Sequence, residues 1–495
     1  MSNRTYNHWI NGAEQAPSSH QHIERLSPAH GGLLARFASG SEQDVDAAVA
    51  HAKALHVAGT WAALPGSERA KLLNKLAELI ERDADRLAEI EAEEVGKPIM
   101  YAKGEVLWSA ELTRFAASLA WQIKGEAYTH LGEDKLGLVT REARGVVGLI
   151  VPWNFPMVCL FQKLPYALAA GCPVVIKPSE LTSGTALEVA RLATEAGFPA
   201  GLINVVTGSG AVVGERLTRH PDVSMISFTG STRVGKQIAA TAAADLTRVA
   251  LELGGKAANV VFADADLDAA LDGVLFGVIL NQGEECVAGT RLLVEASVAD
   301  EFVARLVERA NRVVVGLPMD DKTQIGALIH AQHLESVLDY IAVGKQEGGR
   351  LVCGGERLTE GALANGYFVG PTIFTEVKPE HRIFREEIFG PVLTVTTFTT
   401  VEQAIALAND TDYGLGNGLW TKDVDKALKV SQQLQSGTVF VNTYLESAPQ
   451  LPFGGYKQSG YGRENGVDGL HEFLEVKSTF IKLGARTPVL PNTLG

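Results

Sequence analysis

The four cysteines of the chain differ in their surroundings, and one of them has a setting that suits chemistry. Cys286 follows a helical pattern, is flanked by Gly283 and Gly289, and has the polar neighbours Glu284 and Glu285, which predicts an accessible loop where a thiol meets a ligand. Two interpretations of Cys286 remain open: a nucleophile, or an exposed thiol without a chemical role. No histidine motif supports a cysteine protease, and no metal site is predicted. Core packing is favoured for Cys159, Cys172 and Cys353.

Two glycine-rich segments follow successive strand-like runs and could contact phosphate. Residues 230–236 (GSTRVGK) match the phosphate-loop pattern until Gln237 replaces the Ser or Thr that would hold magnesium, which disfavours a nucleoside triphosphatase. What remains is a strand that turns through glycine into a helix N-terminus, a setting suited to phosphate. Residues 208–214 (GSGAVVG) are one residue off the dinucleotide fingerprint. Each loop alone is more typical of a turn, whereas the two together favour a dinucleotide.

The elements around these residues predict a parallel sheet with helices on both faces, because short apolar, β-branched runs alternate with helical patterns such as 185–196 and 211–219. In such a fold, ligands bind beyond the carboxyl ends of the strands. Upstream, 67–95 has an amphipathic helical pattern with Ser67 as the predicted N-cap. The strand-like runs are 145–151, 173–177, 202–207, 224–228 and 258–262.

A second block with the same alternation follows Gly255, so we predict two α/β domains with a boundary near Gly254 and Gly255. Its first helical stripe, over 266–282, leads into Cys286. The last segment, 475–482, has the alternating pattern of a strand. This strand could pair with another subunit or form an edge of a sheet within the same chain. The alternation continues through 290–294, 301–314, 350–353, 392–397 and 438–442.

Length and charge exclude several classes of protein. The 495 residues are enough for about three average domains or two large ones, and the net charge of −14 argues against nucleic-acid and membrane partners. No apolar stretch approaches the roughly 20 residues that span a bilayer, and the N-terminus shows no signal-peptide pattern. Four cysteines are too few for a disulfide framework, so we expect a soluble cytoplasmic protein.

Seven segments, in their order along the chain, resemble the aldehyde dehydrogenase superfamily in its NAD(P)-dependent, non-acylating form. The resemblance covers essentially the whole chain, including the spacing between Glu252 and Cys286. It implies an α/β fold with two doubly wound parallel-sheet domains, a Rossmann-like cofactor domain and a catalytic domain, and a small protruding oligomerisation sheet. The segments are PWNFP (152–156), KPSE (177–180), FTGSTRVG (228–235), LELGGK (251–256), NQGEECVAGTR (281–291), EEIFGPV (386–392) and PFGGYKQSGYGRE (452–464).

The resemblance also implies domain limits and an oligomer. Residues 1–124 and 144–255 would form the cofactor-binding domain, and 256–458 the catalytic domain. Residues 125–143 and 475–482 would form the oligomerisation sheet. Because the family forms dimers and tetramers through this sheet, a homodimer or homotetramer is expected.

By this resemblance the reaction oxidises an aldehyde to its carboxylic acid. Cys286, as thiolate, would attack the carbonyl carbon, and the Asn154 amide and the Cys286 N–H would stabilise the oxyanion of the thiohemiacetal. Loss of hydride leaves a thioester, and Glu252 resembles the base that activates water to hydrolyse it. Gly254 and Gly255 are expected to let this base change position.

The same resemblance assigns the cofactor contacts. Lys177, also counted among the catalytic residues, and Glu180 resemble the pair that holds the adenosine ribose, and Glu387 with Phe389 the pair at the nicotinamide. A carboxylate at Glu180 accepts hydrogen bonds from a ribose 2′-hydroxyl and repels a 2′-phosphate, which favours NAD and leaves NADP open. The rest of the cofactor path would be lined by Trp153, Gly210, Gly230 and Ser231.

The expected substrate pocket combines carboxylates with an aromatic ring. Glu285 and Glu446 beside Trp108 suit a cationic aldehyde through charge and cation–π attraction. The sequence is equally compatible with both carboxylates pointing into water at the mouth of the substrate tunnel. Residues 446–460 resemble betaine-aldehyde and aminoaldehyde dehydrogenases, and 289–295 resemble the branch that handles γ-glutamyl-aminobutyraldehyde. The remaining pocket residues are Phe155, Cys159, Gln162, Leu280, Val287, Leu445 and Ser447.

Two other functions on the same scaffold remain open, and one position departs from the family. Transfer of the acyl group to coenzyme A needs no water-activating base, so Glu252 counts against it. Intact catalytic residues count against a catalytically silent binding or structural protein. Glu284 stands where the family more often has Gln, and with Glu285 it is expected to raise the pKa of the Cys286 thiol and slow its attack.

Overall fold

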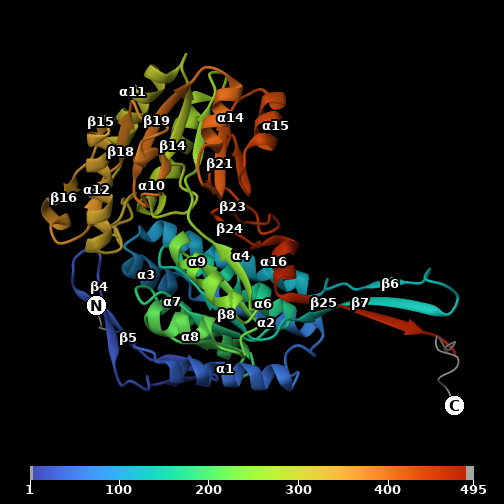
Figure 1. Cartoon of the computed structure of the whole chain (residues 1–495). Coiled ribbons are helices and arrows are strands. Elements are labelled where there is room, and N and C mark those ends of the chain that lie inside the picture. Colours follow the sequence, from blue (N-terminus) through green and yellow to red (C-terminus); the bar gives the residue numbers. More distant parts are fainter. Residues whose placement is uncertain (1–3, 486–495) are drawn as a thin grey trace.

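The computed structural model describes residues 4–485 and contains two α/β lobes (Figure 1). Predictions that extend to residues 1–3 lie partly outside this range. Each lobe is built on a largely parallel sheet, and a narrow three-stranded sheet projects from the first lobe. This arrangement confirms the predicted fold class. No helix among the described residues is both long and apolar enough to cross a membrane.

The first lobe contains an eight-stranded sheet in the order β24-β12-β11-β8-β9-β10-β2-β3, in which the run from β12 to β10 is parallel. Val147 and Leu149 enter the core on one face of β8 and Ile150 enters the core on the other, so both faces demand apolar residues. The strands are β2 His8–Ile10, β3 Ala13–Gln15, β8 Val147–Ile150, β9 Val174–Lys177, β10 Ile203–Val205, β11 Met225–Thr229, β12 Arg248–Glu252 and β24 Gly460–Tyr461.

The second lobe contains a seven-stranded sheet in the order β15-β18-β19-β14-β13-β21-β22, with only β15 antiparallel to its neighbour. Its apolar strands are again buried on two sides by separate core clusters. The strands are β13 Ala258–Val261, β14 Arg291–Glu295, β15 Arg350–Cys353, β18 Thr372–Thr375, β19 Val392–Phe398, β21 Gly416–Trp420 and β22 Thr438–Val441.

Helices cover both faces of each sheet. In the first lobe, one core cluster joins the sheet to α2 Gly66–Arg82, α3 Ala84–Val95, α4 Ile99–Ala120, α5 Pro156–Phe161, α6 Leu164–Ala170, α7 Gly184–Ala196 and α16 Gly466–Glu472. The opposite face packs against α1 Glu42–Val57, α8 Glu215–Thr218 and α9 Thr232–Ala243. In the second lobe, α10 Leu267–Ile279 and α11 Ala299–Ala310 cover one face. The other face packs against α12 Ala331–Gln346, α13 Arg382–Arg385, α14 Val401–Asn409 and α15 Val424–Gln433.

The projecting sheet consists of β6 Glu126–Tyr128, β7 Lys135–Ala143 and β25 Leu474–Lys482. β25 pairs antiparallel with β7 along its whole length, so the arm joins segments distant in sequence (Figure 1, right). Three short sheets complete the fold. They are β1 Arg4–Tyr6 with β5 Leu33–Ala38 and β4 His22–Leu26, β16 Arg357–Leu358 with β17 Phe368–Val369, and β20 Tyr413–Gly414 with β23 Tyr456–Lys457.

Three local predictions were wrong. The pattern over 67–95 forms two helices that meet at Asp83, and α2 starts at Gly66 after Pro65, so Ser67 lies inside the first turn and is no cap. The stripe over 266–282 ends its α-helix at Ile279, because the next residues leave helical geometry. Strand β12, which the strand-like runs omit, lies beside β11 in the first sheet.

Candidate active site

Parallel strands of the first sheet end at one edge, and four of them bring a predicted site residue there. Asn154 follows β8 and Lys177 ends β9, while Gly230 follows β11. Glu252 ends β12, in register with Thr229 at the end of β11. The site therefore forms where a parallel α/β sheet binds its ligands, beyond the carboxyl ends of its strands.

A cavity of about 260 Å³ lies between this edge and the second lobe, and Cys286 reaches it. Cys159, which the resemblance also places in the substrate pocket, lines the same cavity. The thiol of Cys286 thus shares one space with Asn154 and Gly230, whereas Glu252 and Lys177 do not line it. The lining residues are Pro152, Trp153, Asn154, Cys159, Thr229, Gly230, Ser231, Leu253, Gly254, Cys286, His333, Glu387 and Phe389.

A left-handed corner places Cys286 at the cavity. Asn281 and Gln282 have φ of 48° and 58°, and Gly283 has φ of 72°. A side chain at Gly283 would come within 2.4 Å of the Gly390 backbone, so this position requires glycine for both conformation and space. The corner ends α10 and turns the chain so that Cys286 points toward the ends of the first sheet.

Amide groups of two asparagines hold the corner and leave donors near the thiol. Asn154 Nδ2 donates to the Glu284 carbonyl at 2.9 Å, and Asn281 Nδ2 donates to the Asn154 and Glu284 carbonyls at 2.9 and 3.0 Å. An amide nitrogen carries two hydrogens, so Asn154 keeps one for a ligand. The Cys286 N–H forms no hydrogen bond within residues 4–485. Two donors beside a nucleophile are the arrangement that stabilises an oxyanion.

The Cys286 thiol is held in its protonated form. Burial raises its pKa well above the usual range, and the charges of Glu285, Glu387 and Glu252 add to the effect. The upward direction agrees with the prediction, and Glu285 is among its causes. Glu284 is fully buried, and its Oε1 accepts from the Ile329 N–H at 2.9 Å.

Glu252 is a buried carboxyl group with an unused oxygen. Its Oε2 has no hydrogen-bond partner among the described residues, and burial raises its pKa to about 8. Lys163 opposes this shift through its charge. Lys163 is fully buried, donates to Thr229 Oγ1 at 2.6 Å and forms an ion pair with Glu464. None of these three charged groups lines the cavity, and Lys163 contacts the cavity wall through Thr229, which does.

Aromatic rings from both lobes and one carboxylate form a further wall of the cavity. The rings of Trp153 and Phe389 meet edge to face at 5.4 Å, and His333 packs on both. Glu387 Oε1 accepts the Gly255 N–H at 3.0 Å, and burial raises the pKa of Glu387 to about 7. A flat ring fits between such walls, and a carboxylate at its rim suits a ribose hydroxyl.

The other side of the cavity opens to the start of α9, where Ser231 is the N-cap. The N-terminus of this twelve-residue helix favours a phosphate group through free N–H groups and the helix dipole. Together with the flat-walled part, the site fits a nicotinamide dinucleotide. Lys177 and Glu180 lie outside the cavity lining and pair with each other at 3.1 Å. Gly210, also outside it, begins the turn before α8, and a Cβ there would meet no atom within 4 Å.

Gly254 and Gly255 have a packing role that the sequence interpretation did not predict. A Cβ at Gly254 would lie 2.3 Å from Glu387 Oε2, and one at Gly255 would lie 2.1 Å from the Cys286 carbonyl oxygen. Both positions exclude a side chain because the cofactor-side carboxylate and the nucleophile segment pack directly on this backbone.

A second cavity, of about 320 Å³, contains several predicted substrate-pocket residues. Trp108, Phe155 and Leu445 line it as predicted, whereas Gln162 and Glu285 are half-buried and absent from its lining. Glu446 is exposed and also absent from the lining. We call this space the entrance cavity. Its lining residues are Met100, Tyr101, Gly104, Glu105, Trp108, Phe155, Val158, Leu280, Leu445 and Ser447.

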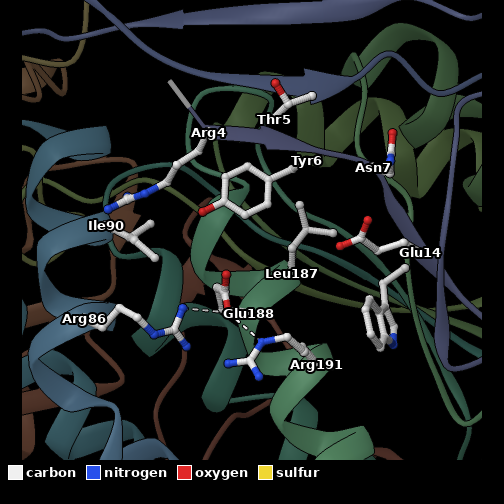
Figure 2. A pocket seen from close by; sticks show the side chains of 11 residues that line it. Arg4, Thr5, Tyr6, Asn7, Glu14, Arg86, Ile90, Leu187, Glu188 and Arg191 are labelled. Atoms are coloured by element: carbon white, nitrogen blue, oxygen red, sulfur yellow. Dashed lines mark hydrogen bonds and ion pairs between the residues drawn. The ribbon is translucent and has the colours of Figure 1, made fainter. Parts of the chain in front are cut away.

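A third cavity, of about 390 Å³, lies among β1, β2, α3 and α7 and shares no lining residue with the other two (Figure 2). Its guanidinium groups already have carboxylate partners. Glu188 pairs with Arg86 at 2.7 Å and with Arg191 at 3.0 Å, and Arg4 lies 3.8 Å from Glu93. No cysteine lines this space, so it carries none of the chemistry described above.

Four residues near the two working cavities were missed from the sequence. Lys163 had a local signal, since it is the one charge in the apolar run 155–164, and buried charges need partners. Its partner Glu464 lies 301 positions away, so no spacing rule connects them. Glu105 and His333 sit on helical segments with no distinguishing pattern.

Comparisons with known proteins agree with this site. The model of the aldehyde dehydrogenase family matches residues 15–479. The NADP/NAD-dependent aldehyde dehydrogenase PuuC from Escherichia coli (strain K12) is 43% identical over 480 residues, covering 96% of each chain. Betaine aldehyde dehydrogenase from Bacillus subtilis (strain 168) is 43% identical over 455 residues, covering 92% of this chain and 93% of the relative.

Among solved structures, an NAD-dependent aldehyde dehydrogenase from Sinorhizobium meliloti superposes with a TM-score of 0.97. It is 43% identical, and the match covers 98% of this chain and 96% of that one. The identity is high enough, and the coverage complete enough, for activity class to follow with the fold. The chain therefore belongs to the aldehyde dehydrogenase family and is an NAD(P)-dependent aldehyde dehydrogenase.

Proposed function

We propose that the protein oxidises a cationic aldehyde to its carboxylic acid, with Cys286 as the nucleophile. One observation carries the proposal: a thiol, the Asn154 amide and an unbonded Cys286 N–H face one cavity. An aldehyde carbon next to the thiol would place its oxygen at these two donors. Each donor of this kind is worth about 3 to 4 kcal/mol of the barrier.

Attack requires the thiol to lose its proton, because burial holds Cys286 protonated. The candidate acceptors are the carboxylates whose charges Cys286 senses, Glu285, Glu387 and Glu252, and Oε2 of Glu285 and of Glu252 has no partner among the described residues. The thiolate then adds to the carbonyl carbon, and Asn154 and the Cys286 N–H hold the oxyanion of the thiohemiacetal.

The dinucleotide would be held by groups of both lobes. Glu387 would accept a hydrogen bond from the nicotinamide ribose, and Trp153 and Phe389 would enclose the nicotinamide ring. Gly230 and Ser231 would contact the pyrophosphate. Lys177 and Glu180 would hold the adenosine ribose, with Gly210 nearby. When bound, the nicotinamide supplies an acceptor for the hydride that leaves the aldehyde carbon.

The remaining thioester would be hydrolysed by water that Glu252 deprotonates. The Lys163–Glu464 pair beside Thr229 keeps a positive charge near Glu252 and favours its ionised form. Because water is activated here, direct hydrolysis is favoured over transfer of the acyl group to coenzyme A.

The substrate side of the proposal depends on charge. Glu105 lines the entrance cavity with Trp108, and Glu285 directly precedes Cys286. Carboxylates and an aromatic ring attract a cation. The relatives support the same class, since one is named a betaine aldehyde dehydrogenase and none of the lining residues of the entrance cavity is cationic.

A panel of aldehydes with NAD tests this function. We expect NADH formation, measured by absorbance, with amino- and betaine-type aldehydes at a higher kcat/KM than with propanal or hexanal. Neutral aldehydes that exceed the cationic ones by tenfold or more would reject the cationic class. Absence of NADH with every aldehyde would reject the catalytic proposal and favour a silent protein.

NAD is expected to give a higher kcat/KM than NADP, because Glu180 is half-buried beside Lys177 and would repel a 2′-phosphate. Replacing Glu180 by Gln is expected to lower the ratio of kcat/KM with NAD to kcat/KM with NADP by about tenfold. This is the size expected when one charge–charge repulsion is removed at a partly exposed site. The exposed Glu356→Gln variant is the matched control. An excess for NADP in the native enzyme would contradict the role given to Glu180.

We further infer a homodimer or homotetramer of a cytoplasmic protein, joined through the arm of residues 125–143 and 475–482. Phe480 and Val476 of β25 are 67% and 58% exposed, and Tyr128 of β6 is 49% exposed. Apolar side chains on a projecting sheet favour contact with a second copy. In this scheme 1–124 and 144–255 hold the cofactor and 256–458 supplies the nucleophile.

A further inference from the structure

Glu285 has a carboxyl oxygen that the protein leaves without a partner. Its Oε2 is inaccessible to solvent and forms no hydrogen bond within the described residues. Burial raises the pKa of this side chain to about 8, and the charge of Glu105 adds to the shift. Buried acceptors without partners are rare and costly, and next to a nucleophile they indicate a group that a ligand satisfies.

Neighbouring side chains are already committed and cannot satisfy Glu285. Lys97 Nζ donates to both oxygens of Glu105, at 2.8 and 2.6 Å, and is fully buried. The Tyr444 hydroxyl donates to the Val287 carbonyl at 2.9 Å. One lysine thus neutralises one carboxylate, and the second carboxyl group stays available to a cation.

Glu285 lies next to the thiol and close enough to the entrance cavity to sense the charge of Glu105, although Glu285 itself lines neither cavity. It precedes Cys286, its pKa responds to Glu105, and the charge of Glu285 in turn raises the pKa of Tyr444. Glu105 and Leu445, which follows Tyr444, both line the entrance cavity. Because Glu285 directly precedes Cys286, we expect a cationic group of an aldehyde bound at the thiol to lie within reach of its carboxyl group.

The aromatic surface of the entrance cavity is poorly suited to a quaternary ammonium group. The Phe155 ring already carries the Lys97 ammonium 4.2 Å from its centre. The Tyr101 ring packs edge-on against Phe276 at 6.3 Å. Among the aromatic rings that line the cavity, Trp108 is therefore the one without an aromatic or cation–π contact. Quaternary ammonium groups bind in cages of several aromatic faces, whereas a primary ammonium group has three N–H donors for carboxyl oxygens.

We infer that Glu285 selects aldehydes bearing a primary ammonium group over those bearing a trimethylammonium group. An N–H of the substrate donates to the unpartnered Oε2, and Glu105 with its Lys97 partner forms the polar side of the passage. A trimethylammonium group has no N–H, so it leaves the buried oxygen unsatisfied. This inference rests on the proposed oxidation of cationic aldehydes at Cys286.

Two pairs of aldehydes of equal shape test the selection. β-Aminopropanal is compared with butanal, and β-(trimethylammonio)propanal with β-tert-butylpropanal, using kcat/KM from NADH formation. We expect Glu285→Gln to lower the β-aminopropanal to butanal ratio by about 100-fold, because it removes the charge that the ammonium group contacts. The trimethylammonio ratio is expected to change by less than about threefold, as for a cation that lacks a hydrogen bond.

The control variant is Glu356→Gln, which removes an exposed carboxylate of the second lobe and is expected to change neither ratio. Thermal unfolding of both variants shows whether the fold is kept, and the ratios cancel any effect of Glu285 on the thiol itself. Equal losses in both ratios would indicate a general charge effect and overturn the inference, as would unchanged ratios. A native enzyme that oxidises neither β-aminopropanal nor butanal would instead refute the proposed oxidation at Cys286.

A pH series gives a second readout. The groups that face Glu285 are Glu105 and Lys97 from the α4 side, Tyr444 after β22 and Cys286 itself. The KM for β-aminopropanal is expected to fall as the pH rises through about 8, because Glu285 then ionises. The KM for butanal should not follow this change. A parallel fall for both aldehydes would contradict the selection by Glu285.

Discussion

Replacing Cys286 by alanine is expected to lower kcat/KM for every aldehyde by about 10⁵-fold, as for loss of other covalent nucleophiles. Without sulfur no thiohemiacetal forms, and the Asn154 amide and the residue 286 N–H have no oxyanion to hold. NADH formation at saturating NAD measures the loss. Binding of NAD, followed by quenching of tryptophan fluorescence, is expected to persist because Trp153, Glu387 and Phe389 remain in place.

Cys353→Ala is the matched control, since Cys353 lies on β15 of the second lobe and bonds to Asn311 and Pro371. It is expected to keep native activity. If the Cys286 variant oxidised aldehydes at the native rate, the thiol would have no covalent role. If both variants lost activity equally, the cause would be instability and not the loss of a nucleophile.

Replacing Glu252 by glutamine is expected to lower steady-state turnover by about 10³-fold, a typical contribution of a general base. The first turnover can still yield NADH, because oxidation precedes hydrolysis. We therefore expect a burst of NADH close to one per active site, followed by a slow phase. Mass spectrometry of the quenched enzyme should show the acyl group on Cys286.

The native enzyme provides a pH test of the same role. Burial raises the pKa of Glu252 to about 8, so the carboxyl group is mostly protonated at neutral pH. The ionised fraction, which can act as the base, increases as the pH rises. Steady-state turnover limited by hydrolysis should rise through about pH 8 and then level off. A flat profile, or a Glu252 variant without acyl-enzyme, would remove Glu252 from the hydrolytic step.

Much of the fold and of the nucleophile site is predictable from local sequence. The run 145–151 is apolar on consecutive residues, which occurs where a strand is buried on two faces, and β8 is such a strand. Parallel strands deliver Asn154 and Glu252 to one edge, so two motifs nearly a hundred residues apart predict one site.

Other parts of the site depend on contacts that sequence spacing does not encode. The cation beside Glu252 is Lys163, and its partner Glu464 lies between β24 and α16, near the end of the chain. The backbone of Gly390 leaves no space for a Cβ at Gly283, and this contact between residues distant in sequence requires glycine in the left-handed corner that Asn281 and Gln282 begin. Likewise, Glu105 and not Glu446 lines the entrance cavity, and this choice depends on how α4 packs.

The late return of the chain to the first sheet has a consequence for biosynthesis. Gly460 of β24 pairs with Glu252, and Glu464 follows shortly after it. A nascent polypeptide exposes its reactive sulfur well before it contains the strand and the carboxylate that complete the neighbourhood of the base. The segment that completes the surroundings of the base is therefore synthesised among the last parts of the first lobe, well after the nucleophile.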